Sequence, residues 1–242
     1  MSIRLRQVAL VARDLDAAEA AITDSLGLEV CFRDPGVAEF GLRNVLFPVG
    51  HDFLEVVSPV VPDTTAGRLM DRRGGDCGYM VLLQVDDLPA MRRRLGEMGA
   101  RIVFEAVAEG IHGLHVHPRD IGGAILSVDR TGPPCGPDDW PWAGPQWRDH
   151  VTDSVSSLTA VDIAAEDPAA MARRWAELLG PDRLNGTTVV LDSGEIRFVP
   201  VTGGRGEGVI ALEMATDGPP ATHGICGCRV RLVPDPRTRG QE

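Results

Sequence analysis

The sequence has no lysine, because all 24 of its basic residues are arginine. This absence excludes Schiff-base chemistry and a lysine acting as general base. The sequence also lacks an apolar run long enough to span a membrane, and residues 1–4 form no apolar signal core. These absences predict a protein that works away from membranes.

Cysteine is too sparse and too scattered to supply a disulfide framework, since the chain has five cysteines, an odd number. We therefore expect a protein of the reducing cytoplasm. The closest pair, Cys226 and Cys228, has neither the spacing of a zinc knuckle nor that of a CxxC redox pair. Ordinary strand residues are expected there.

An excess of basic charge is missing as well. The formal net charge of the 242-residue chain is −11, which argues against nucleic acid and anionic membrane surfaces as partners. The hydrophobic content of 43% and the charged content of 24% are those of an ordinary globular protein. A chain of this length can bury a substantial core.

What the sequence does contain is a repeated order of elements. Apolar spacing and turn residues predict a strand, a helix and three strands over 4–12, 15–26, 29–32, 38–47 and 53–57. After a polar connector the same order is predicted over 79–85, 86–98, 101–107, 113–117 and 123–129. The segment from Gln7 aligns with the segment from Met80, an offset of 73 residues that suits paired modules rather than a solenoid. We therefore predict two βαβββ modules, over 1–60 and 76–130.

The rest of the chain predicts a linker and a weaker third unit. Residues 131–157 are rich in proline and carry three tryptophans, which we expect to fasten this linker onto the body rather than to bind a ligand. A third, degenerate βαβββ-like module is expected over 158–242, with a disordered tail from Pro234. This module could be a structural element or cover a second copy of the chain, so a homodimer stays open.

The strand predicted from Phe53 to Val57 carries the leading candidate for chemistry, Glu55. Both faces of this strand are apolar, which is typical of a strand buried between two layers. A buried carboxylate needs a metal, an arginine or a hydrogen-bond network as partner. The alternative is a glutamate at the rim that simply reaches water.

Three segments stand in order within the duplicated modules: Val11 to Asp16, Phe53 to Pro59, and His117 to Gly123. Together they resemble the vicinal oxygen chelate superfamily, which comprises glyoxalase, bleomycin-resistance, extradiol dioxygenase and methylmalonyl-CoA epimerase proteins. The likeness covers residues 1–130 well and 158–233 weakly, and it is closest to the glyoxalase-like branch. The resemblance implies an α+β fold in which tandem βαβββ modules with curled mixed sheets form a cup, followed by a third degenerate βαβββ-like module.

The resemblance also implies a metal site on the first and fourth strands of each module. Carried over by position, the ligands fall on Gln7, Glu55, Met80 and Ser127. Gln7 and Glu55 match residues that the family uses, whereas Met80 replaces a histidine and Ser127 a glutamate. Because a thioether and a neutral hydroxyl are poor ligands for a hard cation, we expect at most one weakly held divalent ion, on Gln7 and Glu55.

Other side chains could take part in the cup. His115 is a candidate for the second proton-transfer group or a ligand, with a plain lining role as the alternative, whereas His117 precedes a proline and is expected to serve a turn. Glu105 and Asp129 are further acid candidates, both expected to be solvated rather than catalytic. The predicted ligand-binding set comprises Gln7, Met80, Ser127, Phe53 and Glu105.

These residues support two classes of function. The leading hypothesis is a glyoxalase-like isomerase or lyase that abstracts a proton next to the carbonyl of a small-molecule substrate. Glu55 would be the base or a metal ligand, Gln7 would orient an oxygen or the metal, and His115 would transfer the second proton. The alternative is a non-catalytic ligand-binding protein of the drug-resistance or sensor type, which the loss of two family ligand positions favours.

Overall fold

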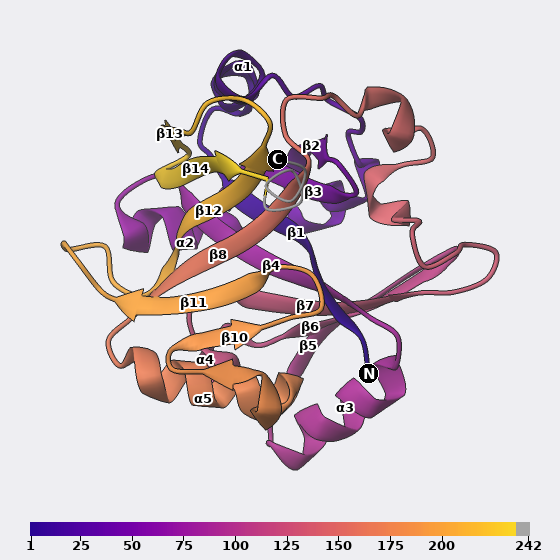
Figure 1. The fold of residues 1–242 in the computed structure, drawn as a ribbon, viewed down its shortest axis with the longest axis vertical. Coiled ribbons are helices and arrows are strands. Elements are labelled where there is room, and N and C mark those ends of the chain that lie inside the picture. The colour runs from indigo at the N-terminus through magenta and orange to yellow at the C-terminus, as the bar shows by residue number, and fades with distance from the viewer. Residues whose placement is uncertain (236–242) are drawn as a thin grey trace, which may run out of the picture.

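The computed structural model describes residues 1–235, which form two seven-stranded mixed sheets with helices around them (Figure 1). The first sheet has the strand order β2-β3-β1-β4-β7-β6-β5. Its strands are β1 (Ile3–Val11), β2 (Leu42–Val49), β3 (Asp52–Pro59), β4 (Cys77–Val85), β5 (Ile102–Ala108), β6 (Ile111–Val116) and β7 (Ile125–Thr131). The helices of this half are α1 (Leu15–Leu26), α2 (Thr65–Arg73), α3 (Leu88–Glu97) and α4 (Pro118–Ile121).

The centre of the first sheet joins the two predicted modules. Strands β1 and β4 pair antiparallel, and each has a parallel neighbour on its other side, β3 beside β1 and β7 beside β4. The helix that follows each central strand begins after a capping aspartate, because the side chains of Asp14 and Asp87 accept backbone N–H groups of the first turn. The α+β fold of tandem βαβββ modules with curled mixed sheets is thus confirmed.

One part of the first module differs from the prediction. The strands predicted over 29–32 and 38–47 are reduced to a single bridge between Phe32 and Leu46 and to β2, which begins only at Leu42. Between them lies a 3-10 helix, Pro35–Phe40. The carboxylate of Asp34 caps this helix, and Gly41, at a φ of 68°, ends it. The turn signal at Asp34 therefore outweighs the apolar run that follows it.

The second sheet repeats the pairing pattern of the first. It has the order β13-β14-β12-β8-β11-β10-β9, and its centre is again an antiparallel pair, β8 and β12, flanked by the parallel strands β11 and β14. Its elements are β8 (Ser157–Ala165), α5 (Pro168–Leu179), β9 (Leu184–Asn185), β10 (Thr188–Val190), β11 (Glu195–Pro200), β12 (Gly208–Thr216), β13 (Ala221–Ile225) and β14 (Cys228–Pro234). The elements from β8 to β11 thus form the βαβββ-like third unit predicted from residue 158. The strands β12, β13 and β14 follow it without a helix. Beyond Asp235 the predicted tail lies outside the described residues.

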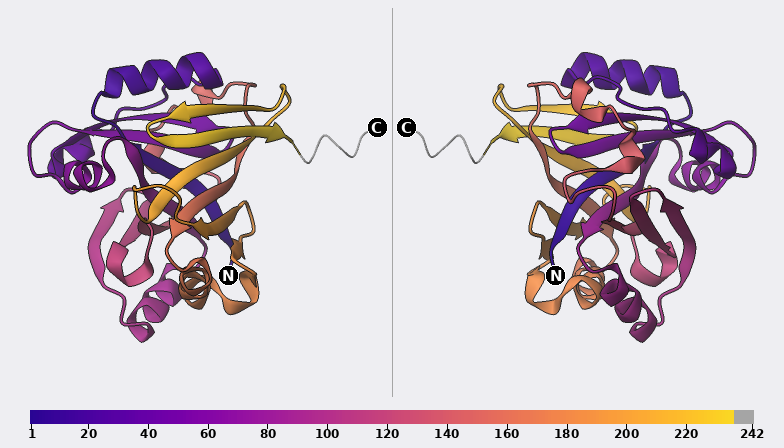
Figure 2. Two further views of the ribbon diagram at one scale, coloured as in Figure 1. Left: turned by 90° about the vertical axis from the view of Figure 1, so that its left-hand side faces the viewer. Right: turned by 90° about the vertical axis from the view of Figure 1, so that its right-hand side faces the viewer.

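The two sheets share one hydrophobic core. A single buried cluster contains Val8 and Leu10 of β1 together with Ile163 of β8 and Leu212 of β12. Helix α1 covers one end of the molecule, and α3 and α5 lie at the other (Figure 2). Among residues 1–235 no helix is long and apolar enough to cross a membrane. Because of the shared core, one face of the first sheet packs on the second sheet, and the other face is not covered by it.

Candidate functional site

A cavity of about 390 Å³ opens on the free face of the first sheet. Strands from both modules contribute to its wall, as do the 3-10 helix Pro35–Phe40 and the segment after β7. Most of its surface is apolar. The polar and sulfur-bearing side chains that matter below are those of Gln7, Asn44, Glu55, Met80, His115 and Trp142.

Glu55 is the buried carboxyl of this cavity, with 8% of its surface exposed. Its Oε2 accepts a hydrogen bond of 2.8 Å from Gln7 Nε2, and its Oε1 accepts one of 2.6 Å from Asn44 Nδ2. The three residues come from adjacent strands, β1, β2 and β3, which brings them to one spot on the sheet. A carboxylate held by two amide donors is fixed in orientation, so its free lone pairs have a set direction.

Both amides are fixed with their NH₂ groups toward Glu55. Trp140 Nε1, which can only donate, lies 2.7 Å from Gln7 Oε1, so the oxygen of that amide faces the indole. The backbone N–H of Asp34 likewise donates to Asn44 Oδ1 at 2.8 Å. Neither amide can flip without breaking its second hydrogen bond. Both amides therefore donate to Glu55, and each of the two carboxyl oxygens of Glu55 accepts one hydrogen bond.

Burial and hydrogen bonding act on the pKa of Glu55 in opposite directions. Desolvation is the larger effect and raises the pKa to about 6, whereas the hydrogen bonds from Asn44 and Gln7 lower it. The carboxyl is thus ionised at neutral pH and still basic enough to accept a proton. Because both amides already occupy one side of each oxygen, an incoming proton is taken on the side open to the cavity.

The indole of Trp140 is a positioning group, and its removal gives a testable result. We expect Trp140→Phe to free the Gln7 amide to rotate, since phenylalanine fills most of the space but donates no hydrogen bond. The pKa of Glu55 should then rise, because one of the two hydrogen bonds that stabilise its charged form is weakened. Trp142→Phe removes an indole whose N–H donates to Asp129 and not to Gln7, and it serves as the control. Equal pKa values in wild type and Trp140→Phe would contradict this role.

The structure brings only part of the predicted site together. Gln7, Glu55, Met80 and His115 all line the cavity. Phe53 does not, because it is buried on the far side of Gln7, where Trp140 and Trp147 pack against it and fasten the linker to the body. Phe53 therefore packs the linker against the body and does not line the cavity.

Glu105 and Ser127 also lie away from the cavity lining. The side chain of Glu105 is 42% exposed and pairs with Arg92 at 2.5 Å and with His112. Its neighbours Phe104 and Ala106 line the cavity, so alternation along β5 turns Glu105 to the opposite side. Ser127 is fully buried within the sheet.

Asp129 is a buried acid that the sequence reading expected in solvent. It is fully buried, and Trp142 Nε1 donates to its Oδ1 at 3.0 Å. Burial raises its pKa to about 7. Gly113 makes room for it, because a Cβ at that glycine would lie 2.1 Å from Asp129 Oδ1. A glycine inside a strand, beside an acid on the next strand, is the signal in the sequence that could have indicated this packing.

The donor set does not fit the divalent metal ion that the resemblance implies. Both oxygens of Glu55 are engaged by amides, and the remaining family positions hold a thioether at Met80 and a buried hydroxyl at Ser127. Among the described residues no three His, Cys, Asp or Glu side chains are grouped so that they could hold a metal ion. Gln7 and Glu55, the two residues predicted to hold the ion, are instead hydrogen-bonded to each other.

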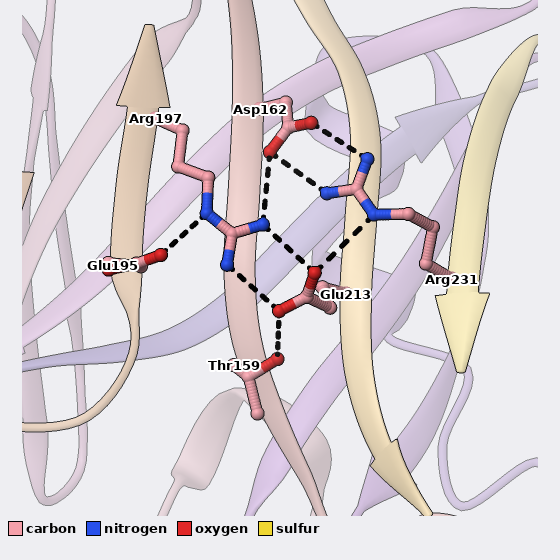
Figure 3. Close-up of polar contacts among 6 residues, drawn as sticks. All are labelled: Thr159, Asp162, Glu195, Arg197, Glu213 and Arg231. Carbon is pink, nitrogen blue, oxygen red and sulfur yellow. Dashed lines mark hydrogen bonds and ion pairs between the residues drawn. The ribbon is translucent and has the colours of Figure 1, made fainter. Parts of the chain in front are cut away.

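The matching face of the second sheet is filled by ion pairs (Figure 3). Arg197 binds Glu213 through two hydrogen bonds of 2.9 Å, and Arg231 binds Asp162 at 2.8 and 3.1 Å. By strand pairing, Arg197 occupies the position of Glu55, since it lies opposite Asp162 as Glu55 lies opposite Ala9. The second sheet thus has no counterpart of the Glu55 network.

The fold and the cavity define the class of this protein. Two βαβββ modules joined through an antiparallel β1–β4 pair, with a site on the free face of the curled sheet, make it a member of the vicinal oxygen chelate superfamily. The sequence profile of the glyoxalase-like domain matches residues 8–179. The chain therefore belongs to the glyoxalase-like family.

Known proteins are similar to about half of the chain or to nearly all of it. The ethylmalonyl-CoA/methylmalonyl-CoA epimerase of Cereibacter sphaeroides is 26% identical over 132 residues, which are 53% of this chain and 98% of that protein. The crystal structure of methylmalonyl-CoA epimerase from Mycobacterium tuberculosis shares 27% identity over 54% of this chain and 89% of its own, with a TM-score of 0.47. A hypothetical protein from Staphylococcus aureus covers 97% of this chain and 100% of its own at 12% identity and a TM-score of 0.71, which shows a shared fold over both sheets.

Proposed function

We propose that this protein is an isomerase that moves a proton at the carbon next to a carbonyl group, with Glu55 as the base. The observation that carries the proposal is the buried carboxylate that two fixed amides hold beside an apolar cavity. A raised pKa near the working pH is what a general base needs. The name of the Cereibacter relative, an epimerase of malonyl thioesters, supports the same class of reaction.

The chemistry can be written with the residues present. Glu55 takes the proton from the carbon, the electrons of the broken C–H bond move onto the carbonyl oxygen, and an enolate forms. Glu55 then releases its proton to solvent, and a proton from solvent adds to the opposite face of that carbon as the enolate collapses. This gives the isomer, and no oxidant or reductant is needed. The apolar wall of the cavity strengthens the interactions that stabilise the enolate.

His115 is the candidate for the group that meets the enolate. It lines the cavity from β6, which lies three strands away from β1 in the curled sheet. Burial lowers its pKa to about 4, so the imidazole is neutral at physiological pH. A neutral imidazole is a weak acid, but its N–H can donate a hydrogen bond to a developing oxyanion. We therefore assign His115 to oxygen stabilisation and not to proton delivery as an imidazolium.

Proton exchange in heavy water tests the proposal. Methylmalonyl-CoA, the substrate named for the relatives, is the probe, and deuterium incorporation at its C2 carbon is followed by mass spectrometry. The protein is expected to speed exchange far above the spontaneous rate. Exchange at the spontaneous rate with this thioester would overturn the proposal for malonyl thioesters.

The dependence of the exchange rate on pH gives a second prediction. Since only ionised Glu55 accepts a proton, kcat/KM should rise with pH, pass its midpoint near the raised pKa of about 6, and level off above it. Asp129 is another buried carboxyl, and its pKa of about 7 lies in the same range, so Asp129→Asn is the control and should leave the midpoint in place. A midpoint that moves with Asp129→Asn would mean that Asp129, and not Glu55, is the titrating base.

A binding protein without turnover is the second candidate. It is favoured by the poor fit of the donor set to a divalent ion, since the superfamily site that the resemblance implies is a metal site. A pure binding protein would retain ligand affinity when Glu55 is changed and would show no exchange in the wild type. The same exchange experiment therefore separates the two candidates.

A further inference from the structure

A second hollow of about 880 Å³ adjoins the cavity that holds Glu55, and we call it the basic groove. Its walls come from α2, the start of β4, the segment around α4, and residues 205–208 before β12. Tyr79 and Ile125 line both hollows, so the two share a wall. The strongly charged side chains of the groove are those of Arg68, Arg72, Arg73, Arg119, Arg205 and Glu207.

The charge of the basic groove is opposite to that of the chain. Five arginines face one carboxylate, in a protein whose net charge is −11. Within residues 1–235 none of these five arginines forms an ion pair with a carboxylate, although many arginines elsewhere do. The carboxylate of Glu207 accepts the backbone N–H of Glu166. Among the described residues no carboxylate thus neutralises these five guanidinium groups, so the groove can attract an external anion.

Two of the arginines form a fixed floor. Arg73 is buried and donates to the carbonyl oxygens of Gly206, at 2.7 Å, and of Glu207. Arg205 donates in return to the carbonyl oxygen of Arg73 at 3.0 Å. Carbonyl acceptors hold a guanidinium in place without cancelling its charge. Arg68, Arg72 and Arg119 are exposed, so they lie at the rim and can reach a ligand.

We propose that the basic groove binds the phosphate groups of the substrate. The acyl end of the same molecule then passes Tyr79 and Ile125, which line both hollows, and reaches Glu55. This inference rests on the proposed function and names the class of substrate, an acyl thioester with a phosphorylated carrier arm. Arginine suits this task because its planar fork binds phosphate oxygens in pairs. Arg205 lies in the loop between β11 and β12 of the second sheet, so the groove needs both halves of the chain.

Calorimetry with free coenzyme A and with inorganic pyrophosphate tests the groove without any turnover. Arg72→Gln and Arg119→Gln change two exposed rim residues and leave the floor intact. Each is expected to weaken coenzyme A binding about 5- to 10-fold, and the double variant about 30- to 100-fold. Pyrophosphate should compete with coenzyme A. Arg93→Gln, at an exposed arginine of α3 outside the groove, is the matched control and should leave the affinity unchanged.

The outcomes that overturn the proposal are distinct. Coenzyme A affinity that is equal in wild type and double variant means that the phosphates bind elsewhere. Pyrophosphate binding without coenzyme A binding reduces the groove to a site for free phosphate and overturns the role in substrate binding.

A substrate without phosphates separates this proposal from the proposed function. Methylmalonyl-pantetheine carries the same acyl end, so we expect exchange with a similar kcat and a KM about 30-fold higher or more, and no effect of Arg72→Gln on that KM. Equal KM values for the two thioesters would overturn the groove while the isomerase stands. Coenzyme A binding that depends on Arg72 and Arg119, with no exchange on either thioester, would instead overturn the isomerase while the groove stands.

Discussion

Glu55→Gln is expected to lower the rate of deuterium exchange at the substrate carbon about 10²- to 10⁴-fold, the usual contribution of a general base. Glutamine has the size of glutamate but no basic oxygen. Its NH₂ group must also face the NH₂ group of either Gln7 or Asn44, because both amides are fixed by Trp140 and Asp34. We therefore expect a further cost of about 1–3 kcal/mol in the free energy of unfolding from one unsatisfied buried donor.

Glu39→Gln is the matched control for this prediction. Glu39 lines the same cavity but is exposed, and its carboxylate has no part in the Glu55 network. Its exchange rate and stability should stay close to those of the wild type. An exchange rate for Glu55→Gln within a factor of three of the wild type would show that Glu55 is not the base.

The second large effect concerns the dependence of the first sheet on the second. A fragment of residues 1–150 is expected to aggregate or to unfold without cooperativity, because it exposes the apolar face that packs on β8 and β12. It also loses the hydrogen bonds that tie the halves together, from Leu158 N to Asp52 Oδ2 and from Leu5 N to the carbonyl oxygen of Ser193. We propose on this basis that the chain folds as one unit.

A point variant gives the same test without truncation. Leu212→Ala removes a fully buried side chain from the core shared by the sheets and should cost about 2–5 kcal/mol of unfolding free energy. Val190→Ala, at a residue that is 41% exposed, should cost no more than about 0.5 kcal/mol. Far-UV circular dichroism during urea unfolding measures both. A fragment 1–150 that is monomeric and unfolds in one sharp transition would contradict the prediction.

The sequence predicts the repeated modules and the central pair of the site, because these follow from local periodicity. The period of two along a strand sets which face a residue occupies, and Gln7 and Glu55 accordingly meet on the cavity face. The same alternation shows its limit at β5. A register shift between Ile102 and Phe104 means that the face of Glu105 cannot be read from spacing alone.

The supporting residues could not be predicted, because they arrive from distant segments. Trp140 reaches Gln7 across 133 positions, and Asn44 faces Glu55 only because β2 folds back along β3. The linker tryptophans were expected to fasten the linker onto the body, and Trp140 does so. Its indole N–H also donates to Gln7 and thereby orients the amide that binds Glu55. The basic groove draws its arginines from three separate stretches of chain, and no local pattern marks them as neighbours.

The titration of Glu55 tests the account most directly, since it needs no substrate. Glutamate labelled with ¹³C at the side-chain carboxyl reports each group in the NMR spectrum, and Glu55→Gln identifies the resonance of Glu55. We predict that this resonance titrates with a pKa near 6, above the ordinary value of 4.5, because burial disfavours the charged form. A pKa of 4.5 or lower would place Glu55 in contact with water or with a cation and would contradict its role as a buried base.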